Sequence, residues 1–248
     1  MPELKKSAGM TYLRETRLER DFKPMDRPAI RGCEPYKEYP NSRRFTLPRV
    51  RHDHGKDLWQ SLQDRRSRRR FSAGPMAQDD LALLLWAAQG ITARSGSYFM
   101  RTAPSAGALY PIETYVGINR VTGLPPGIHH FNPAGFFLEQ LTETTPGPFL
   151  ATAALGQKFL ENAAVVMIWT AVFRRNLAKY GNRGMRYILM DAGHICQNLL
   201  LAAESLGFAA CPVAAFFDHE IDLLLNLDEE EESVIYLAGV GPAPPQEP

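Results

Sequence analysis

The sequence is poor in cysteine, with three residues in 248 and no CxxC spacing among them. An odd number of cysteines without paired spacing is typical of free thiols in a reducing compartment, so we expect no disulfides and a cytoplasmic location. Long apolar runs are also missing, since residues 163–169 form one of the longest and are far too few to span a bilayer. The first ten residues contain no signal-peptide core. We therefore expect neither secretion nor membrane insertion.

Positive charge is absent from the end of the chain. No Lys or Arg follows Arg186, so residues 1–186 hold all 28 basic residues and 16 of the 27 acidic ones, a net charge of +12, while the remainder carries −11. Opposite charges of this size favour packing of the two parts against each other. The balanced total argues against a nucleic-acid partner, which would require a basic face over the whole domain. Any phosphate held by Lys or Arg must contact residues before 187.

Several motifs that would assign a chemistry are missing. No GxGxxG follows an expected strand, and no GxxxxGK(S/T) loop, HExxH or paired CxxC occurs. A dinucleotide-binding Rossmann unit and P-loop chemistry are therefore unsupported. His129 and His130 are adjacent on an expected strand, where neighbouring side chains face opposite sides. We do not expect this pair to share a metal ion, and we predict no metal site.

The residues that are present divide the chain into three parts. Residues 1–50 contain several prolines and no sustained periodicity, which indicates an irregular arm that either lies on a surface, such as a partner subunit, or is disordered. Residues 51–241 form the folded domain, and 242–248 a frayed tail. Helices are expected over 79–90 and 184–206, and strands over 113–119, 163–172 and 233–241. This order predicts an α+β fold with a mixed central sheet flanked by helices and an extended N-terminal arm.

An arginine-rich block, RRSRRRF at 65–71, directly follows an expected helix. A guanidinium is a planar fork that holds phosphate at two points, and the hydroxyl of Ser67 can add a short bond to a phosphate oxygen. A solvated basic patch or a nucleic-acid contact would have the same composition. The position of the block between two helices favours a phosphate site.

A second block, APSAGALYP at 103–111, is built from small residues between two prolines. A flat ring can lie against the backbone only where side chains are small, and Ser105, Ala106 and Gly107 allow that approach. Backbone N–H groups there can also bond the edge of a heteroaromatic ring. The alternative is an ordinary tight surface loop.

The third and fourth blocks are FRRNLAKYGNRGMRY at 173–187 and DAGHICQN at 191–198. A lysine ammonium beside a phenol favours the ionised phenol, which can act as a base, and this points to Lys179 and Tyr180. A solvent-facing helix end is the alternative for this pair. In the fourth block, Asp191 and Asn198 share a helix face with His194 and either form hydrogen bonds in the core or line a site.

These four blocks, in this order and at these spacings, resemble the nitroreductase superfamily, and the resemblance covers roughly residues 57–241. The stretches GLPPGIHHFNP, AALGQ and KYGNRGMRYILMDAGHICQN are similar to its SagB-type, azoline-oxidising branch. The resemblance implies an α+β homodimer with FMN at the dimer interface. The residues expected to bind that cofactor, including Arg186 from the third block, are Arg65, Arg66, Ser67, Arg69, Pro104, Ser105, Ala106, Gly107 and Arg186.

The resemblance also implies a chemistry, oxidation of an azoline to an azole. A base removes a proton from the heterocycle while hydride passes to flavin N5, and Lys179 and Tyr180 are the expected catalytic pair. The flavin carries out the redox chemistry, and the protein positions it. Azole formation would require a separate cyclodehydratase or synthetase and a peptide precursor, because no leader-binding domain is evident.

Two departures from the family pattern bear on function. Many nitroreductases carry a basic residue near the C-terminus that reaches the phosphate, and this chain has none after Arg186. Ala108 stands where nitro-reducing relatives often have Asn. An NAD(P)H-dependent nitro, quinone or flavin reductase therefore stays an alternative, as does a flavin-binding scaffold without turnover.

Overall fold

The structure is a computed structural model that describes residues 6–20, 34, 36–51, 55–96 and 98–245. Seven of its strands form the central sheet, in the order β1-β6-β5-β4-β7-β9-β8. Their bounds are Arg43–Thr46 for β1, Ile112–Ile118 for β4, Gly127–Asn132 for β5, Phe137–Gln140 for β6, Val165–Val172 for β7, Phe208–Val213 for β8 and Glu232–Pro242 for β9. The α+β fold class is thereby confirmed.

The pairing within this sheet differs in one respect from the mixed sheet that we expected. Every pairing among the seven described strands is antiparallel. Parallel contacts occur in the described residues only as isolated bridges, such as the one between Ser67 and Ala210. The reason is local: β4, β5 and β6 follow one another through short connections that reverse the chain, and such connections produce antiparallel neighbours.

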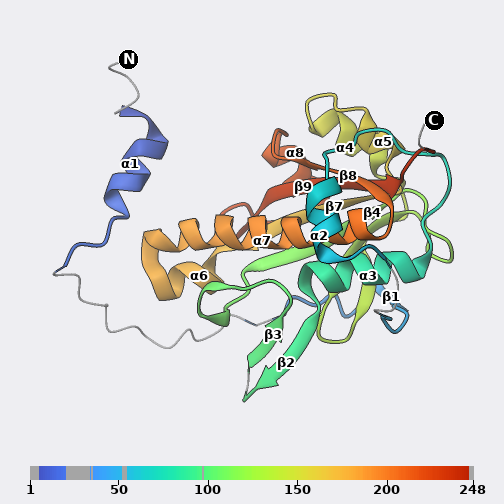
Figure 1. Cartoon of the computed structure of the whole chain (residues 1–248). Coiled ribbons are helices and arrows are strands. Elements are labelled where there is room, and N and C mark those ends of the chain that lie inside the picture. The colour runs from blue at the N-terminus through green and yellow to red at the C-terminus, as the bar shows by residue number, and fades with distance from the viewer. Residues whose placement is uncertain (1–5, 21–33, 35, 52–54, 97, 246–248) are drawn as a thin grey trace.

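Helices cover both faces of the sheet (Figure 1). One hydrophobic core includes residues of α3 and α7, and a second includes residues of α4, α5 and α8. Because both faces are covered, every residue of β4 is buried and the polar–apolar alternation of an exposed strand is lost. The helices are α1 Ala8–Glu15, α2 Leu58–Asp64, α3 Gln78–Gln89, α4 Gly147–Ala153, α5 Phe159–Asn162, α6 Phe173–Tyr180, α7 Gly184–Ser205 and α8 Asp218–Leu224.

The helix α7 organises the functional half of the molecule, because it spans one face of the sheet (Figure 1). Its buried residues Ile188, Ile195 and Leu199 recur at helical spacing and enter the core. The helix ends just before Gly207, whose φ of +77° is the left-handed conformation that glycine tolerates best. The expected helix over 184–206 is thereby confirmed.

The N-terminal region is more regular than the sequence indicated. Residues 8–15 form α1, and β1 pairs with β6 at the edge of the sheet, so the segment expected to be irregular contributes a strand to the fold. Pro242, assigned to the frayed tail, still belongs to β9. Phe22, Cys33 and residues 246–248 lie outside the described residues.

A two-stranded hairpin, β2 Ile91–Ser95 and β3 Tyr98–Arg101, projects from the body of the molecule (Figure 1). It leads directly into the loop at 102–110, which is anchored where the Thr102 N–H donates to the Gly90 carbonyl at 2.9 Å. No helix of the described chain is both long and apolar enough to cross a membrane.

Candidate flavin site

The arginine-rich block runs along the free edge of β8. It follows α2, and the Arg68 N–H donates to the Ala210 carbonyl at 2.9 Å, while Ser67 and Ala210 form a parallel bridge. Pairing of this kind covers an edge strand that would otherwise expose unpaired backbone groups. It also fixes the backbone while the side chains of Arg66, Ser67 and Arg69 stay exposed to solvent.

The arginines of the block serve different purposes. Arg68 donates to Glu204 on α7 at 2.8 Å, so it is committed to an ion pair. Arg66 donates to the Gln63 carbonyl at 2.9 Å, near the C-terminal end of α2. Among the described residues, neither Arg65 nor Arg69 forms an ion pair with an acidic side chain. Their guanidinium charges are therefore available to an anion.

Contacts between early bases and late acids agree with the charge asymmetry of the sequence. Lys56 donates to Glu204 at 2.7 Å, and Lys37 donates to Glu232 at 2.6 Å. Each pair joins the basic first part of the chain to the acidic last part. The expectation that the two parts pack together is confirmed at these positions.

The loop at 103–110 has an unusual backbone. Gly107, Ala108 and Tyr110 have φ values of +66°, +53° and +45°. Two of these are not glycine, and a left-handed conformation costs such residues roughly 1–2 kcal/mol each. Strain of this kind persists only where the surroundings enforce it, and it is frequent at ligand-binding sites.

A buried aspartate on α7 fixes the start of this loop. Ser105 Oγ donates to Asp191 Oδ2 at 2.5 Å and accepts from the Tyr110 N–H at 2.9 Å. Burial raises the pKa of the Asp191 carboxyl, while its hydrogen bonds from Ser105 and from the Ala106 amide act in the opposite direction. The sequence left open whether Asp191 forms hydrogen bonds in the core or lines a site, and the structure joins it to the predicted ring-binding loop.

The expected catalytic pair reaches the middle of the same loop. Lys179 Nζ and Tyr180 Oη both lie 2.6 Å from the position that a Cβ on Gly107 would occupy. The ammonium of Lys179 is also 5.3 Å from the centre of the Tyr180 ring. Glycine suits the backbone angle at 107, and a Cβ there would displace Lys179 or Tyr180. The structure thus brings the second and third sequence blocks together.

A hollow of about 280 Å³ adjoins this loop. It lies between the loop and α7, so its walls include Pro104, Ser105 and Ala106 on one side and Tyr187, Met190 and His194 on the other. Tyr187 packs edge-on against Tyr180 with ring centres 4.9 Å apart. The sequence analysis did not single out Tyr187, the last residue of the third block, or Met190, which directly precedes the fourth block. Both lie on the face of α7 that is turned towards the loop.

These features fit the head group of a flavin. A flat tricyclic ring needs a mainly apolar slot with small residues on one side and a few polar groups at its edge. The strained loop offers the small residues, and Ser105, Lys179 and Tyr180 place polar atoms beside it. The exposed arginines of the block at 65–71 carry the charge that a phosphate tail needs.

Arg186, which we expected to bind the cofactor, is engaged by α1 instead. Its Nη2 donates to the Leu13 carbonyl at 2.6 Å and its Nε to Thr16 Oγ1 at 2.8 Å. Arg183 donates to the Thr16 carbonyl at 2.6 Å. Both cations thereby cap the C-terminal end of α1, where carbonyl groups carry partial negative charge.

The blocks expected to bind the phosphate and the ring are not brought together within one chain. Arg68 contacts Glu204 near the end of α7, whereas Ser105 contacts Asp191 near its start. Thirteen residues separate these two acids, which corresponds to about 20 Å along a helix axis. A single flavin would have to stretch along the whole intervening surface to contact both blocks of the same chain.

The fold and site define a class: an α+β oxidoreductase with a slot for a planar cofactor between a strained loop and a long helix. The model of the nitroreductase family matches residues 62–242, so the chain belongs to the nitroreductase family. The protein MJ1384 of Methanocaldococcus jannaschii, whose name places it among the nitroreductases, is 39% identical over 168 residues, which cover 68% of this chain and 83% of that protein.

A second relative is the microcin B17-processing protein McbC of Escherichia coli, 29% identical over 136 residues. That alignment covers 52% of this chain but only 49% of McbC, so the chain spans about half the length of this relative. Its name assigns McbC to the processing of a microcin.

Two solved structures are similar in fold. A nitroreductase-type protein from Anabaena variabilis has a TM-score of 0.75 and 26% identity over 95% of this chain and 47% of its own. The Escherichia coli microcin synthetase McbBCD, bound to truncated pro-MccB17, has a chain with a TM-score of 0.61 and 23% identity, over 74% of this chain and 73% of that one. These neighbours confirm the nitroreductase-like fold.

Proposed function

We propose that this oxidoreductase binds FMN and oxidises an azoline to an azole in a small or peptidic substrate. The observation that carries the proposal is the convergence of Lys179 and Tyr180 on Gly107, at the centre of the loop predicted to support the flavin ring. The similarity to McbC, a microcin-processing protein, supports a peptide substrate. A synthetase that forms the azoline would then act before this protein.

The residues of the site divide the reaction between them. Conversion of an azoline to an azole removes one hydride and one proton, and bound FMN would supply the hydride acceptor. The phenolic oxygen of Tyr180 takes the proton from the ring carbon, and the ammonium of Lys179 stabilises the negative charge on that oxygen before the transfer. The hydrogen bond between Ser105 and Asp191 holds the loop in place, so that the hydride acceptor and the base face the same substrate molecule.

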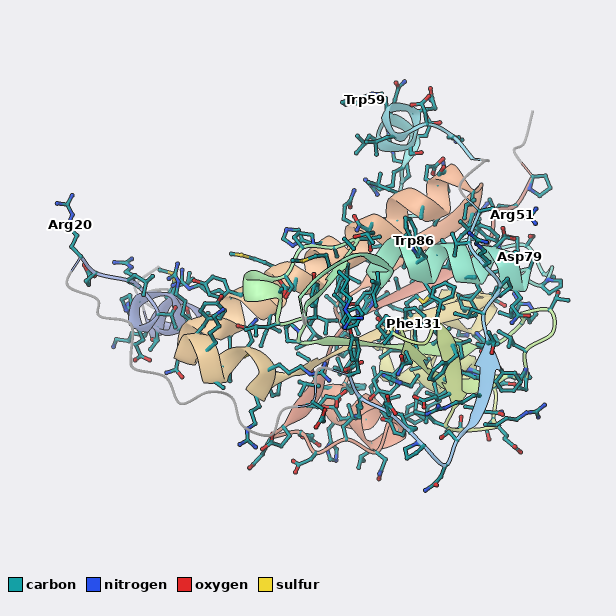
Figure 2. The ribbon with its side chains drawn as sticks, turned by 90° about the horizontal axis from the view of Figure 1, so that it is seen from below. Arg20, Arg51, Trp59, Asp79, Trp86 and Phe131 are labelled. Atoms are coloured by element: carbon teal, nitrogen blue, oxygen red, sulfur yellow. The ribbon has the colours of Figure 1, made fainter. Side chains whose placement is uncertain are left out.

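The cofactor would be held between two copies of the chain. Because the two blocks of one chain lie about 20 Å apart along α7, we place the phosphate on the arginines of one subunit and the ring on the loop of the other. Exposed apolar side chains on α2 and α7 support a subunit contact there: Trp59 is 78% exposed and Met190 56% exposed. Figure 2 shows α2, with Trp59, standing out from the body of the molecule.

Mixing two variants, each impaired at one end of the site, tests this arrangement at an FMN concentration too low to load the Arg69→Ala variant. Arg69→Ala weakens the phosphate end, and Tyr180→Phe removes the base. In a mixed dimer with shared sites, one site combines both intact halves, so a 1:1 mixture should regain about one quarter of wild-type sites, as expected for a two-fold symmetric interface. No recovery after subunit exchange would show that each site lies within one chain.

The redox reaction is tested anaerobically with the FMN-loaded protein. A thiazoline-containing peptide should bleach the flavin absorbance and yield a product lighter by two hydrogens in mass spectrometry. Wild-type protein that binds FMN but leaves the peptide unchanged would contradict the proposal.

An NAD(P)H-dependent reductase is the second candidate, and the 39% identity to MJ1384 favours it. The two candidates differ in electron donor. Rapid bleaching by NADPH alone, without any azoline, would support the reductase, whereas a flavin that NADPH leaves oxidised supports the dehydrogenase.

A further inference from the structure

A series of charged groups, buried except for Arg44 at its outer end, connects the edge of the sheet to α6. Arg44 on β1 donates to Glu139 on β6 at 3.0 Å, and Glu139 lies 3.1 Å from Nδ1 of His130 on β5. The other ring nitrogen of His130 is 3.0 Å from Glu113 on β4. Glu113 in turn accepts from Arg175 on α6 at 2.5 Å. Charges of alternating sign thus cross four strands and end on the helix that carries Lys179 and Tyr180.

The charges of the groups in this series follow from the geometry of their contacts. Both ring nitrogens of His130 face carboxylate oxygens, so both carry a proton. Burial acts to lower the pKa of His130, but its hydrogen bonds to Glu113 and Glu139 raise it above the ordinary value. Burial likewise acts to raise the pKa of Glu113, and the charge of Arg175 with the His130 hydrogen bond holds it well below its usual range. Glu113 is therefore a fixed anion next to Arg175.

Arg175 is also in contact with the end of the ring-binding loop. Its Nη1 lies 3.3 Å from the Tyr110 carbonyl, and its Nε donates to the Glu34 carbonyl at 3.0 Å. Tyr110 closes the loop, since its own N–H is bound to Ser105. Arg175 lies four residues before Lys179, on the same side of α6. One buried guanidinium therefore joins the loop to the helix of the expected catalytic pair.

Stability alone does not account for such an arrangement. Replacement of a buried ion pair by well-packed apolar residues is often neutral or stabilising, because the charges lose their hydration. What a buried guanidinium adds is directional bonding: its planar fork fixes several acceptors at set angles. Here the acceptors are Glu113 on β4, the Tyr110 carbonyl of the loop and the Glu34 carbonyl, so the guanidinium sets the position of α6 relative to all three.

We propose that Arg175 is a positioning residue that fixes the distance between the Tyr110 end of the loop and the Lys179–Tyr180 pair, and that Glu113 holds its guanidinium in place. The inference rests on the proposed function, because the pair must act at this loop. A lysine at 175 would keep the charge but could not bond to Glu113 and the Tyr110 carbonyl in the same geometry.

Arg175→Lys in the full-length, FMN-loaded protein tests the inference, with Arg174→Lys on the exposed side of α6 as the matched control. We expect kcat for the thiazoline peptide to fall on the order of 10- to 100-fold, as small misplacements of a catalytic group do. The KM and the FMN dissociation constant should change less than about twofold, and Arg174→Lys should behave as wild type. Unchanged kcat in Arg175→Lys would overturn the inference.

A double-variant cycle separates positioning from a general loss of structure. If Arg175 acts through the pair, then Arg175→Lys should cause no further loss once Tyr180→Phe is present. Fully additive losses would overturn the inference while leaving azoline oxidation intact. The proposed function fails separately, if the wild-type protein itself does not oxidise the peptide. Glu113→Gln should reproduce the Arg175→Lys effect, since it removes the anion that holds the guanidinium.

Discussion

Ser105 donates a 2.5 Å hydrogen bond to Asp191, a residue eighty-six positions later in the chain, and this bond fixes the loop at 103–110 to α7. Asp191→Asn replaces one acceptor oxygen by a donor, which would then face the Ser105 hydroxyl or the Ala106 amide. We expect FMN affinity to fall by roughly tenfold, equivalent to about 1.4 kcal/mol. Gln197→Ala, an exposed change on the same helix, is the control. Equal FMN dissociation constants for the two variants would argue against the role of Asp191.

Gly107 offers a sharper test because a matched glycine exists. Gly107 and Gly156 have φ values of +66° and +76°, so alanine imposes similar backbone strain at both. A Cβ at 156 meets no atom within 4 Å, whereas at 107 it lies 2.6 Å from Lys179 Nζ and from Tyr180 Oη. We expect Gly107→Ala to displace the pair and abolish most turnover, while Gly156→Ala loses only about 1–2 kcal/mol of stability. Similar kinetics for both variants would contradict this account of the site.

Tyr180→Phe removes the proton acceptor but keeps the ring that packs against Tyr187. General-base catalysis contributes typically 10²- to 10⁴-fold, so we expect a kcat loss of about that range. FMN binding should be unaffected, and the melting temperature should stay near that of wild type. A variant that retains most of its turnover under substrate saturation would show that another group takes the proton.

If the arginine block binds the phosphate, its variants should distinguish FMN from riboflavin. Loss of Arg65 or Arg69 removes a charge-assisted bond to phosphate, worth roughly 1.5–3 kcal/mol. Each alanine variant should therefore bind FMN about tenfold or more weakly, while the affinity for riboflavin, which lacks the phosphate, stays constant. Arg94→Ala in the β2–β3 hairpin is the control. An equal loss for both flavins would mean that these arginines act on the fold and not on the phosphate.

The burial of His129 predicts how the stability of the protein depends on pH. Burial lowers the pKa of His129 to about 4, against a partial opposing effect of its hydrogen bond to the Gly127 carbonyl. In the unfolded chain, the imidazole of His129 takes the ordinary histidine pKa of about 6.5. The stability that neutral His129 provides is thus present above pH 6.5 and is lost as the pH falls towards 4, by about 3 kcal/mol.

Denaturant melts between pH 7 and pH 4 would measure this loss, with His129→Leu as the comparison. The variant has no imidazole to protonate and should show a flatter stability profile over the same interval. In the wild-type protein, Nε2 of His129 has no hydrogen-bond partner among the described residues, so replacing the imidazole by leucine removes no bond at that atom. Parallel profiles for wild type and variant would assign the acid sensitivity to other groups.

Several structural features around this candidate site could be predicted from the sequence because their signals are local. Small residues mark the loop at 103–108, and the tandem Lys179–Tyr180 lies on a helix whose end is marked by Gly181, with a φ of +55°. The helix over 184–206 was predictable from its apolar periodicity. Each of these features is set by neighbours within a few positions in the chain.

What the sequence did not predict depends on long-range contacts. The residues next to Arg186 in the sequence do not indicate that it caps α1, and those around 43–46 do not indicate that this segment pairs with β6. The same holds for Asp191, whose role depends on a partner eighty-six residues away. His130 was considered only as a possible metal ligand and Glu139 was not singled out, because their contact depends on the sheet register. That register pairs His130 with Glu139 and with Tyr115, two residues from Glu113, and it is a property of the assembled sheet.

The central claim is that one molecule of FMN lies with its ring on the loop at 104–107 of one subunit and its phosphate on the arginine block of the other. Titration of FMN into the full-length protein, followed by quenching of flavin fluorescence, tests it most directly. We predict saturation at one FMN per chain, with weaker binding in the Arg69→Ala and Asp191→Asn variants alike. Fluorescence that stays at the level of free FMN throughout the titration of the wild-type protein would contradict the claim.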